Sequence, residues 1–596
     1  MDKLDGLTPD LVATRIDELK TVFPEVFKEG KVDFNAFQSL LGESIEDSNK
    51  NYSFTWFGKT DAEKLAQKRS TGTLRPSMKE SVNFDTTQNL YIEGDNLEVL
   101  KLLSGSYMDR VKMIYIDPPY NTGHDFIYND NFADSIENYK KIIGEASKSN
   151  PETAGRYHTN WLNMMYPRLK LARVLLKEEG VIFISIDDNE VHNLRKVCDE
   201  VFGEENFIAQ IVVQINPRGR HLDRYVAKTH EYVVVYCKSY ESANAMIGVP
   251  KEGKMIDEYN CEDELGKYRP LGLRNRNQSF NPTTRPTLYY PLYVNSKNHK
   301  VSSNKDDSYT DEVWPDTPDG IKTCWTWASK KVDNENDLII AEKTGDEWRI
   351  FRKDYLLGDD GKAATTLIKS LWTENEMNND HGRKVIKELF GTSIMDFPKS
   401  VDLIKRAITA GTKKDSIILD FFSGSATTAH AVLQLNEEDN GNRQFIMVQL
   451  PEACDENSEE YKVGYKNICE IGKERIRRAG MRIKEEYKQQ KISGERAIPD
   501  LGFKVFKLDT SNLRKWDNSF TCEGDSIKSR VLDYYDNLMP GRTQLDMVYE
   551  IMIKCRRPLT SPIKEIEVNG VTAHIVSHSG GGECHHTRIL SACRIT

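Results

Sequence analysis

The sequence lacks any apolar run close to the roughly 18 residues that a membrane span requires. Its first residues, MDKLDGL, contain no basic region followed by an apolar one, so no signal peptide is expected. The ten cysteines form no CxxC pair, and the histidines and cysteine near the C-terminus fit no zinc signature. We therefore expect a protein of the reducing cytoplasm with no membrane span and no structural metal.

A strongly basic composition is also missing. The formal net charge is −10, which argues against a protein that coats nucleic acid indiscriminately but leaves room for a local basic surface. Hydrophobic residues make up 38% and charged residues 29% of the 596 residues, values typical of globular proteins. A chain of this length is expected to fold into about four domains.

Strand-like and helix-like segments alternate in two parts of the chain. Apolar strands are predicted in LYIEGDN, KMIYIDPPY, VIFISIDD and EYVVVYCK, with a helix through WLNMMYPRLKLARVLLKEEG. The alternation resumes with KSVDLIKRAITAG, SIILDFFSGSATTAHAV and RQFIMVQLPE. This order predicts an α/β fold with a doubly wound, mainly parallel sheet, whose ligands bind at the carboxyl ends of the strands.

The segments between these parts set the expected domain boundaries. Thr8 and Pro9 predict a helix start, and one apolar face follows from Leu11 to Phe23, for packing or subunit contact. The expected organisation is a mainly helical N-terminal region over 1–85, a first core part over 86–240, an α+β insert over 241–370, a second core part over 371–490 and a smaller C-terminal domain over 491–596.

The segment IYIDPPYNTG places reactive groups at a strand end. Asp117 follows a buried strand, and Pro118 and Pro119 lack N–H donors and fix the direction of the turn carbonyls. Tyr120 adds a flat face. A carboxylate, a rigid carbonyl and a ring form a socket for a planar group with an exocyclic amine, such as an extruded nucleobase. An ordinary proline turn after a strand is the alternative.

The segment ILDFFSGSATTAHAV predicts a strand, a glycine turn and a helix start. This arrangement lets the backbone approach a ligand and points N–H groups at an anion. It lacks the phosphate-loop lysine and the full GxGxxG spacing, so a small nucleoside that carries a carboxylate suits it better. An ordinary turn between strand and helix is again the alternative.

Arginines gather in the insert without nearby acids. Residues 268–293 contain no Asp or Glu, and tyrosines and asparagines lie among the arginines. Arginine suits phosphates and guanine edges, so this segment and a second one at 214–224 are candidate DNA contacts, with a solvated loop as the alternative. The candidate DNA-binding residues are Arg218, Arg220, Arg269, Arg274, Arg276 and Arg285.

Other polar and aromatic residues have more ordinary interpretations. Trp325 and Trp327 alternate as strand residues of a core do. Asp187 and Asp188 follow a strand, and a helix N-cap is a safer interpretation for them than a metal site. His230 and Glu231 fit a buried hydrogen-bonded pair better than a DNA contact.

Together with IEGDN at 92–96, the two motifs make the chain resemble DNA methyltransferases of the beta order, in which DPPY precedes FxGxG and a recognition insert separates them. More narrowly, the chain is similar to the modification (Mod) subunit of type III restriction-modification systems over roughly residues 50–560. The resemblance implies a Rossmann-like methyltransferase sheet, S-adenosylmethionine as methyl donor and adenine N6 in duplex DNA as acceptor. It also implies a homodimer and a restriction (Res) helicase-nuclease partner.

The resemblance assigns roles to individual residues. The target-base motif is Asp117, Pro118, Pro119 and Tyr120, and the cofactor-binding residues are Asp95, Asp420, Phe422, Gly424, Ser425, Lys399, Ser400 and Gln449. Two departures concern the cofactor. Ala426 replaces the second glycine of FxGxG, which narrows the permitted φ. Gln449 stands where related enzymes carry an acid for the ribose hydroxyls, and Glu452 is the other candidate for that contact.

The implied chemistry is direct methyl transfer to the amine of a flipped adenine. Asp117 and the Pro118 carbonyl would draw the amine hydrogens and favour a localised lone pair, so catalysis is mostly positioning. Asp117→Ala is expected to abolish methylation and to spare cofactor binding.

Four alternatives remain open at this point: a solitary methyltransferase without a nuclease partner, a cytosine-N4 enzyme, a non-catalytic DNA-specificity module and an RNA substrate. The C-terminal residues depart from the family, which predicts a truncated or frame-shifted end. The recognised DNA sequence cannot be derived, because readout depends on where a few side chains lie in space.

Overall fold

The computed structural model describes residues 7–28, 31–34, 37, 40, 54–122, 157–219, 224–242, 244–251, 253–358, 363–395, 398–489, 498–513, 538–568, 571–577 and 588–591. The chain divides into two compact units, one formed by residues 1–247 and 369–596 and the other by residues 248–368. Each unit has its own buried hydrophobic core. Arg220 lies outside the described residues.

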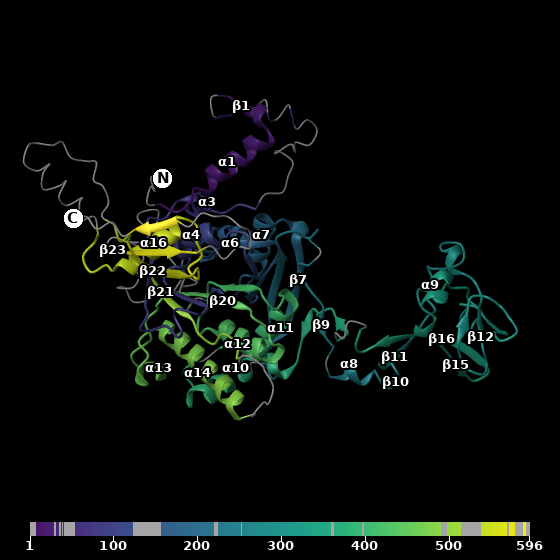
Figure 1. Ribbon diagram of the computed structural model, residues 1–596. Coiled ribbons are helices and arrows are strands. Elements are labelled where there is room, and N and C mark those ends of the chain that lie inside the picture. The colour runs from purple at the N-terminus through teal and green to yellow at the C-terminus, as the bar shows by residue number, and fades with distance from the viewer. Residues whose placement is uncertain are drawn as a thin grey trace, which may run out of the picture. The chain divides into compact units, whose positions relative to one another are not determined.

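A ten-stranded sheet forms the centre of the first unit (Figure 1). Its strands, in spatial order, are β18 (Leu371–Trp372), β7 (Phe207–Gln214), β8 (His230–Cys237), β6 (Leu176–Ile186), β5 (Val111–Ile116), β19 (Ile417–Asp420), β20 (Gln444–Gln449), β4 (Leu90–Glu93), β21 (Lys504–Asp509) and β3 (Thr73–Pro76). Only β8 and β3 run antiparallel to their neighbours. The predicted doubly wound α/β fold is confirmed.

Helices cover both faces of this sheet, as Figure 1 shows. One face carries α3 (Lys59–Gln67), α4 (Asn96–Tyr107), α6 (Tyr157–Leu175), α7 (Val191–Phe202) and α16 (Gln544–Lys554). The other carries α10 (Asn379–Phe390), α11 (Val401–Gly411), α12 (Thr427–Asp439) and α14 (Ile468–Gln489). Strands buried on both faces need continuous apolar sequences, which explains why every residue of β4 and β5 is buried.

The strand order reverses between β5 and β19. The chain continues from β5 through α6 to β6 on one side, and from β19 through α12 to β20 on the other. The two helices leave on opposite faces, so the ends of β5 and β19 face a crevice. The register pairs Met113 with Ile418 and Ile114 with Leu419, which brings Asp117 and Phe422 to the same level of the sheet.

The terminal segments differ from two expectations. The N-cap of α1 (Leu11–Val22) is Asp10 rather than Thr8, because Asp10 accepts hydrogen bonds from two amides of the first turn, whereas Thr8 pairs with Ser70. None of the α1 side chains is buried. From the C-terminal segment, β21 joins the central sheet beside β4, so the sheet extends beyond the expected core boundaries.

The predicted helix through 161–180 is wrong at its end. α6 ends at Leu175 and β6 begins at Leu176, because Leu176 already pairs with Val111 of the parallel strand β5, before the glycine at 180. The predicted helix over KSVDLIKRAITAG is confirmed as α11, with the Ser400 side chain as its N-cap acceptor.

The second unit is built mainly from short antiparallel strands. They are β9 (Val249–Pro250), β10 (Cys261–Asp263), β11 (Gly266–Gly272), β12 (Leu292–Val294), β13 (Val301–Ser302), β14 (Asp311–Val313), β15 (Ile339–Thr344), β16 (Glu347–Tyr355) and β17 (Thr365–Thr366). Two short helices, α8 (Lys254–Asp257) and α9 (Ser329–Asn334), accompany them. Trp325 is buried and Trp327 is partly buried against the same core, as expected.

Shorter elements complete the described chain. They are β1 (Phe27–Lys28), β2 (Lys31–Val32), α13 (Glu459–Lys462), β22 (Ile563–Val568), β23 (Val571–Val576), β24 (Arg588–Ser591) and the 3-10 turns Pro24–Val26, Glu204–Asn206, Pro286–Leu288, Asn336–Leu338 and Asn375–Met377. Within the described residues, every helix is too short or too polar to cross a bilayer.

Candidate active site

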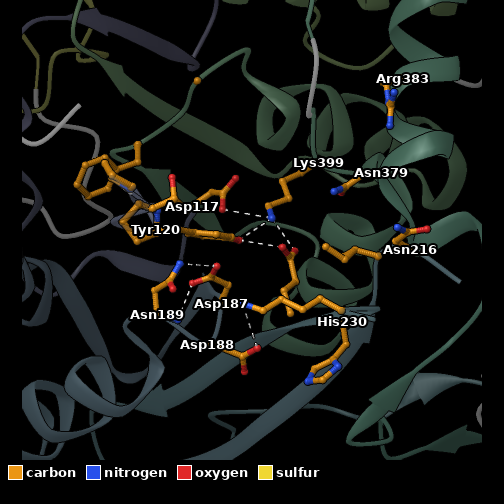
Figure 2. A pocket seen from close by; sticks show the side chains of 18 of the residues that line it. Asp117, Tyr120, Asp187, Asp188, Asn189, Asn216, His230, Asn379, Arg383 and Lys399 are labelled. Carbon is orange, nitrogen blue, oxygen red and sulfur yellow. Dashed lines mark hydrogen bonds and ion pairs between the residues drawn. The ribbon is translucent and has the colours of Figure 1, made fainter. Parts of the chain in front are cut away.

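A cavity of about 1160 Å³ opens at the carboxyl ends of the central strands (Figure 2). The turn after β5 contributes Asp117 and Tyr120, and the loop after β19 contributes Phe422 and Gly424. Its other lining residues are Pro118, Pro119, Thr122, Asp187, Asp188, Asn189, Ile215, Asn216, Lys228, His230, Glu231, Asn379, Asp380, Arg383, Lys399, Gln449 and Glu452. Two motifs separated by some 300 residues of sequence thus line one space.

Four charged and phenolic groups form a cluster in this cavity, as Figure 2 shows for three of them. The Lys399 ammonium donates to the Tyr120 hydroxyl at 2.6 Å and to the Glu231 carboxylate at 2.5 Å. It also lies 3.5 Å from Asp117 Oδ1. The Tyr120 hydroxyl in turn donates to the second Glu231 oxygen at 3.1 Å. The single positive charge of Lys399 therefore lies between two carboxylates and compensates part of their charge.

Burial and charge act in opposite directions on Asp117. Desolvation raises the pKa of its carboxyl above the usual range, Lys399 lowers it and Glu231 raises it. The Oδ1 atom is buried, and among the described residues no donor makes a hydrogen bond to it. This oxygen is available to a donor from a bound molecule.

The two proline carbonyls of the turn differ in their partners. The Trp161 indole donates to the Pro119 carbonyl at 2.7 Å, which fixes that peptide. For the Pro118 carbonyl, the described part of the chain supplies no hydrogen bond. Asn121 follows with its backbone in the left-handed region, at a φ of 60°, and its side-chain amide donates to the Glu190 carboxylate at 2.6 Å. Trp161 and Glu190 therefore fix the turn, while the Pro118 carbonyl can accept a hydrogen bond from a bound molecule.

The side chain of Asp420 stabilises the loop after β19 through hydrogen bonds. The Asp420 carboxylate is buried and accepts from the Thr428 hydroxyl at 2.6 Å and from the Phe422 amide at 3.1 Å. Burial raises the pKa of Asp420 to about 7. Asp420 does not line the cavity. Its position is that of a support for the loop rather than of a ligand contact.

Buried Arg475 supports the same loop from α14. One of its nitrogens donates to Ser425 Oγ at 2.8 Å and to Thr427 Oγ1 at 2.6 Å, and desolvation lowers its pKa to about 9. Sequence reasoning missed Arg475, because nothing near it in the sequence marks it. Ser425 also lies outside the cavity lining.

The loop amides are largely satisfied by the protein itself. Gly424 N donates to the Gln449 side chain at 2.7 Å, Ser423 N to Val448 at 3.2 Å and Ala426 N to Ser423 at 2.7 Å. The expected anion contact through free N–H groups is therefore not the arrangement found at these positions. Gln449 instead fastens the loop to the end of β20, and beside it Glu452 presents a carboxylate to the cavity.

Two other expected cofactor residues lie away from the cavity. Asp95 caps α4 through the Glu98 amide at 3.1 Å and pairs with buried Arg168 at 3.3 Å. Ser400 is fully buried as the N-cap of α11. Neither residue lines the cavity, whereas Lys399, Phe422, Gly424 and Gln449 do.

The candidate residues outside the motifs also have definite partners. Glu231 is buried and binds Lys399 and Tyr120, whereas His230 contacts the Tyr232 hydroxyl at 3.1 Å. The N-cap expectation for Asp187 is wrong: α7 begins after Glu190, and Asp187 accepts from the Asn189 amide in a turn. Among the described residues, no group of three or more His, Cys, Asp or Glu side chains is arranged to hold a metal ion.

The arginines of the second unit fall into two groups. Arg269 pairs with Asp354 at 2.7 Å and with Glu258, so its charge is already compensated. Arg276 and Arg285 are exposed. Arg274 donates to the Asp316 carbonyl at 3.0 Å and, with Arg276, lines a second cavity of about 530 Å³ within this unit. Arg218, in the first unit, is exposed.

The geometry fits a small nucleoside cofactor. Gly424 has φ of 50°, and a Cβ placed on it would point into open space, so the backbone itself forms the wall there. Phe422 and Glu452 line the same space and offer an apolar face and a carboxylate for hydroxyls. A doubly wound sheet with this loop beside a DPPY turn defines the class of the methyltransferases that use a nucleoside cofactor.

Comparison with known proteins gives the family. Residues 111–491 match a family described as DNA methylase. The type III restriction-modification enzyme EcoPI Mod subunit of Escherichia phage P1 is 35% identical over 93% of this chain and 86% of its own length. The StyLTI Mod subunit of Salmonella typhimurium is 33% identical, over 83% and 72%. The type II methyltransferase M.KpnI of Klebsiella pneumoniae is 33% identical, over 65% and 86%.

The chain therefore belongs to the DNA methylases and, among them, to the Mod subunits of type III restriction-modification enzymes. The methyl donor of this family is S-adenosylmethionine.

Proposed function

We propose that the protein transfers a methyl group to N6 of an adenine extruded from duplex DNA, as the modification and recognition subunit of a type III restriction-modification system. One observation carries this proposal. The buried Oδ1 of Asp117 has the Lys399 ammonium 3.5 Å away but accepts no well-formed hydrogen bond from a described residue, and it lies in one cavity with the glycine loop.

The chemistry of an exocyclic amine matches the open acceptors. Asp117 Oδ1 and the Pro118 carbonyl can each accept one N–H of the amine, while the ring of Tyr120 can stack on the base. When both hydrogens are drawn into the plane of the acceptors, the nitrogen lone pair is localised and can be aimed at the methyl group. The bound cofactor supplies an electrophilic methyl group, and the proton of the methylated amine then leaves through Asp117 or water.

Extrusion of the base follows from where these groups lie. Asp117 lines a cavity formed at strand ends, and its Oδ1 is buried. A base paired within a duplex cannot reach such an atom, so enzymes that act on a base edge take the base out of the stack.

Several chain groups suit the cofactor. Gly424 and Phe422 would face its nucleoside part, and the Glu452 carboxylate would accept from ribose hydroxyls. Lys399 suits a carboxylate less than the resemblance implies, because it already binds Glu231 and Tyr120. Asp420, Ser425 and Ser400 would act by holding the loop and α11 in place.

Sequence recognition is assigned to the second unit, with exposed Arg276 and Arg285 as candidate contacts to phosphates and base edges. Arg269 has a structural role instead, because it forms an ion pair with Asp354. The names of the relatives, Mod subunits of type III restriction-modification enzymes, support a restriction (Res) partner, and a homodimer is proposed through the resemblance alone. The type II name of M.KpnI keeps a solitary methyltransferase as the second candidate. A neighbouring gene for a helicase-nuclease would decide between them.

The base specificity is tested by mapping modified bases in DNA from cells that express this chain alone. N6-methyladenine at one sequence is the expected product. N4-methylcytosine would contradict the adenine assignment, because cytosine also carries an exocyclic amine, and the absence of any modified base would favour a non-catalytic specificity module.

The role of Asp117 is tested by Asp117→Ala. We expect methyl transfer to fall by at least about a hundredfold, because the charged acceptor for the amine is lost. Binding of S-adenosylmethionine, measured by calorimetry, should stay within about threefold, since the chain offers other groups to the cofactor. Asp109→Asn, at the opposite end of β5, is the control and should leave both values unchanged. Normal turnover by Asp117→Ala would overturn the assignment.

A further inference from the structure

The connection between β7 and β8 exposes two large apolar side chains. Tyr225 is 84% and Val226 is 79% exposed. Exposed apolar residues are common one at a time, but two adjacent ones at such exposure require a reason. Neither residue belongs to the catalytic cluster or to the glycine loop.

The base of this connection is fixed beside the cavity. The amides of Ile215 and Asn216 both donate to the Thr229 carbonyl, at 3.0 and 3.1 Å. Gly219 has φ of 70°, and a Cβ on it would come within 2.7 Å of the Ala227 methyl, so the two sides of the connection pack closely there. A residue with a Cβ would be strained and crowded at this position, so glycine is favoured there.

The same connection forms part of the cavity wall. Ile215 and Asn216 on one side and Lys228 and His230 on the other line the space that contains Asp117. Figure 2 shows Asn216 and His230 around this space together with Asp117. Tyr225 does not line this space itself, but it is three residues along the chain from Lys228, which does, so it lies within roughly 10 Å of the cavity wall.

The charge around the two apolar residues suits nucleic acid. Arg218 and Arg224 are exposed, and the Arg224 guanidinium lies 5.0 Å from the centre of the Tyr225 ring. Arginines next to such a pair of residues can bind the phosphates on either side of a target nucleotide.

We propose that Tyr225, with Val226 beside it, enters the DNA stack at the target base pair and fills the space that the extruded base leaves. This inference rests on the proposed function, since it requires a base to leave the helix. An extruded base leaves its partner and both neighbouring pairs without stacking contacts, and an aromatic ring supplies a flat surface that replaces them. The ring therefore stabilises the extruded state and not the paired one.

The test uses Tyr225→Ala, Val226→Ala and the double variant in the full chain. Tyr240→Ala is the matched control, because Tyr240 is also exposed, at 63%, but follows the opposite end of β8. Each protein acts on two duplexes that contain the recognised sequence. One has the normal target pair, and the other has an abasic site opposite the target adenine, which makes extrusion easy.

On the paired duplex, we expect Tyr225→Ala to lower kcat/KM for methyl transfer about tenfold to a hundredfold, the range set by loss of one base-aromatic stacking contact. On the abasic duplex, the same variant should be within about threefold of wild type. Fluorescence of 2-aminopurine at the target position should rise on binding wild type and Tyr240→Ala, and much less on binding Tyr225→Ala.

Other results overturn the inference. An equal loss on both duplexes would mean that Tyr225 contributes to folding or to general DNA affinity. Wild-type transfer by the double variant on the paired duplex would mean that the exposed pair contacts another protein or nothing. Failure of the proposed function is separate, because wild type itself would then methylate no adenine, while the fluorescence assay would still report extrusion.

Discussion

Lys399 lies between two carboxylates, and its charge sets the protonation of the one that faces the target group. It is 2.5 Å from Glu231 and 3.5 Å from Asp117. Its own pKa is raised by both carboxylates, although burial opposes that effect. Loss of either partner of the Lys399–Glu231 pair leaves a buried charge with less compensation, so these two residues act on Asp117 even without touching the base.

This arrangement predicts opposite pH shifts for two variants. The groups that act on Asp117 are Lys399, which lowers its pKa, Glu231, which raises it, and the hydroxyl of Tyr120. Glu231→Gln removes a negative charge, so the Asp117 pKa falls and the acidic limb of the kcat-pH profile moves to lower pH. Lys399→Met removes the positive charge, so that limb moves to higher pH.

The measurement is methyl transfer at saturating DNA from acid to neutral pH. Asp188→Asn is the control, since this cavity carboxylate has Tyr232 and Lys228 as partners and should leave the profile unchanged. Shifts in the same direction for Glu231→Gln and Lys399→Met would contradict the assigned charges.

Ala426 shows how one residue can depart from a motif and keep its backbone. Its φ of 59° lies in the left-handed region that the family's glycine would adopt freely. This conformation costs a residue with a Cβ about 1 to 2 kcal/mol. The fully buried methyl group and the hydrogen bond that the Ala426 N–H donates to the Ser423 carbonyl offset part of that cost. Replacement of the family's glycine by Ala426 therefore costs conformational free energy but does not change the course of the backbone.

At the scale of an element, the loop between β19 and α12 is held from three directions. Asp420 supports it from its own strand, Arg475 from α14 and Gln449 from β20. The loop is therefore already placed before a ligand arrives, which lowers the entropy cost of binding.

Gly424→Ala tests the loop as a wall of the cofactor site. The new methyl group would project into the cavity and would strain the backbone, so we expect the dissociation constant for S-adenosylmethionine to rise at least about tenfold, or about 1.4 kcal/mol. Gly391→Ala is the matched control, because Gly391 also has positive φ with open space around it, at the end of α10. Both variants should lose about 1 to 2 kcal/mol of unfolding free energy. Equal cofactor affinity in the two would contradict the site.

At the scale of the whole molecule, the second unit is entered and left through a two-stranded ribbon. β9 and β17 pair antiparallel, with Pro250 opposite Thr365. All lining residues of the cavity that contains Asp117 belong to the first unit. The two units can therefore be separated by experiment without a break in the site.

We expect a chain in which Asn-Gly replaces residues 251–364 to fold and to bind S-adenosylmethionine with the affinity of the full chain, within about threefold. A two-residue turn suits cross-strand partners such as Pro250 and Thr365. Sequence-specific DNA binding, measured against a scrambled duplex, should be lost. Retained specificity would contradict the assignment of recognition to the second unit, and loss of cofactor binding would contradict the independence of the first.

The sequence predicted best where a pattern is local. Buried strands such as 111–116 and the capped helix that begins after Ser400 follow from apolar runs and a capping residue, and both are found. It predicted worse where a partner comes from a distant segment. Asp95 was expected to bind the cofactor, but it forms an ion pair with Arg168 of α6. Arg269 was expected to contact DNA, but it forms an ion pair with Asp354.

By itself, the sequence determined the class of fold, the two motifs and the family, because strand alternation and motif spacing are patterns of the linear sequence. Only the tertiary structure decided that Glu231 and Lys399 meet at Tyr120, that Arg475 supports the glycine loop, and that Tyr225 is exposed. The physical reason is that charge, burial and hydrogen bonding act over a few ångströms in space, whatever the separation of the residues in sequence.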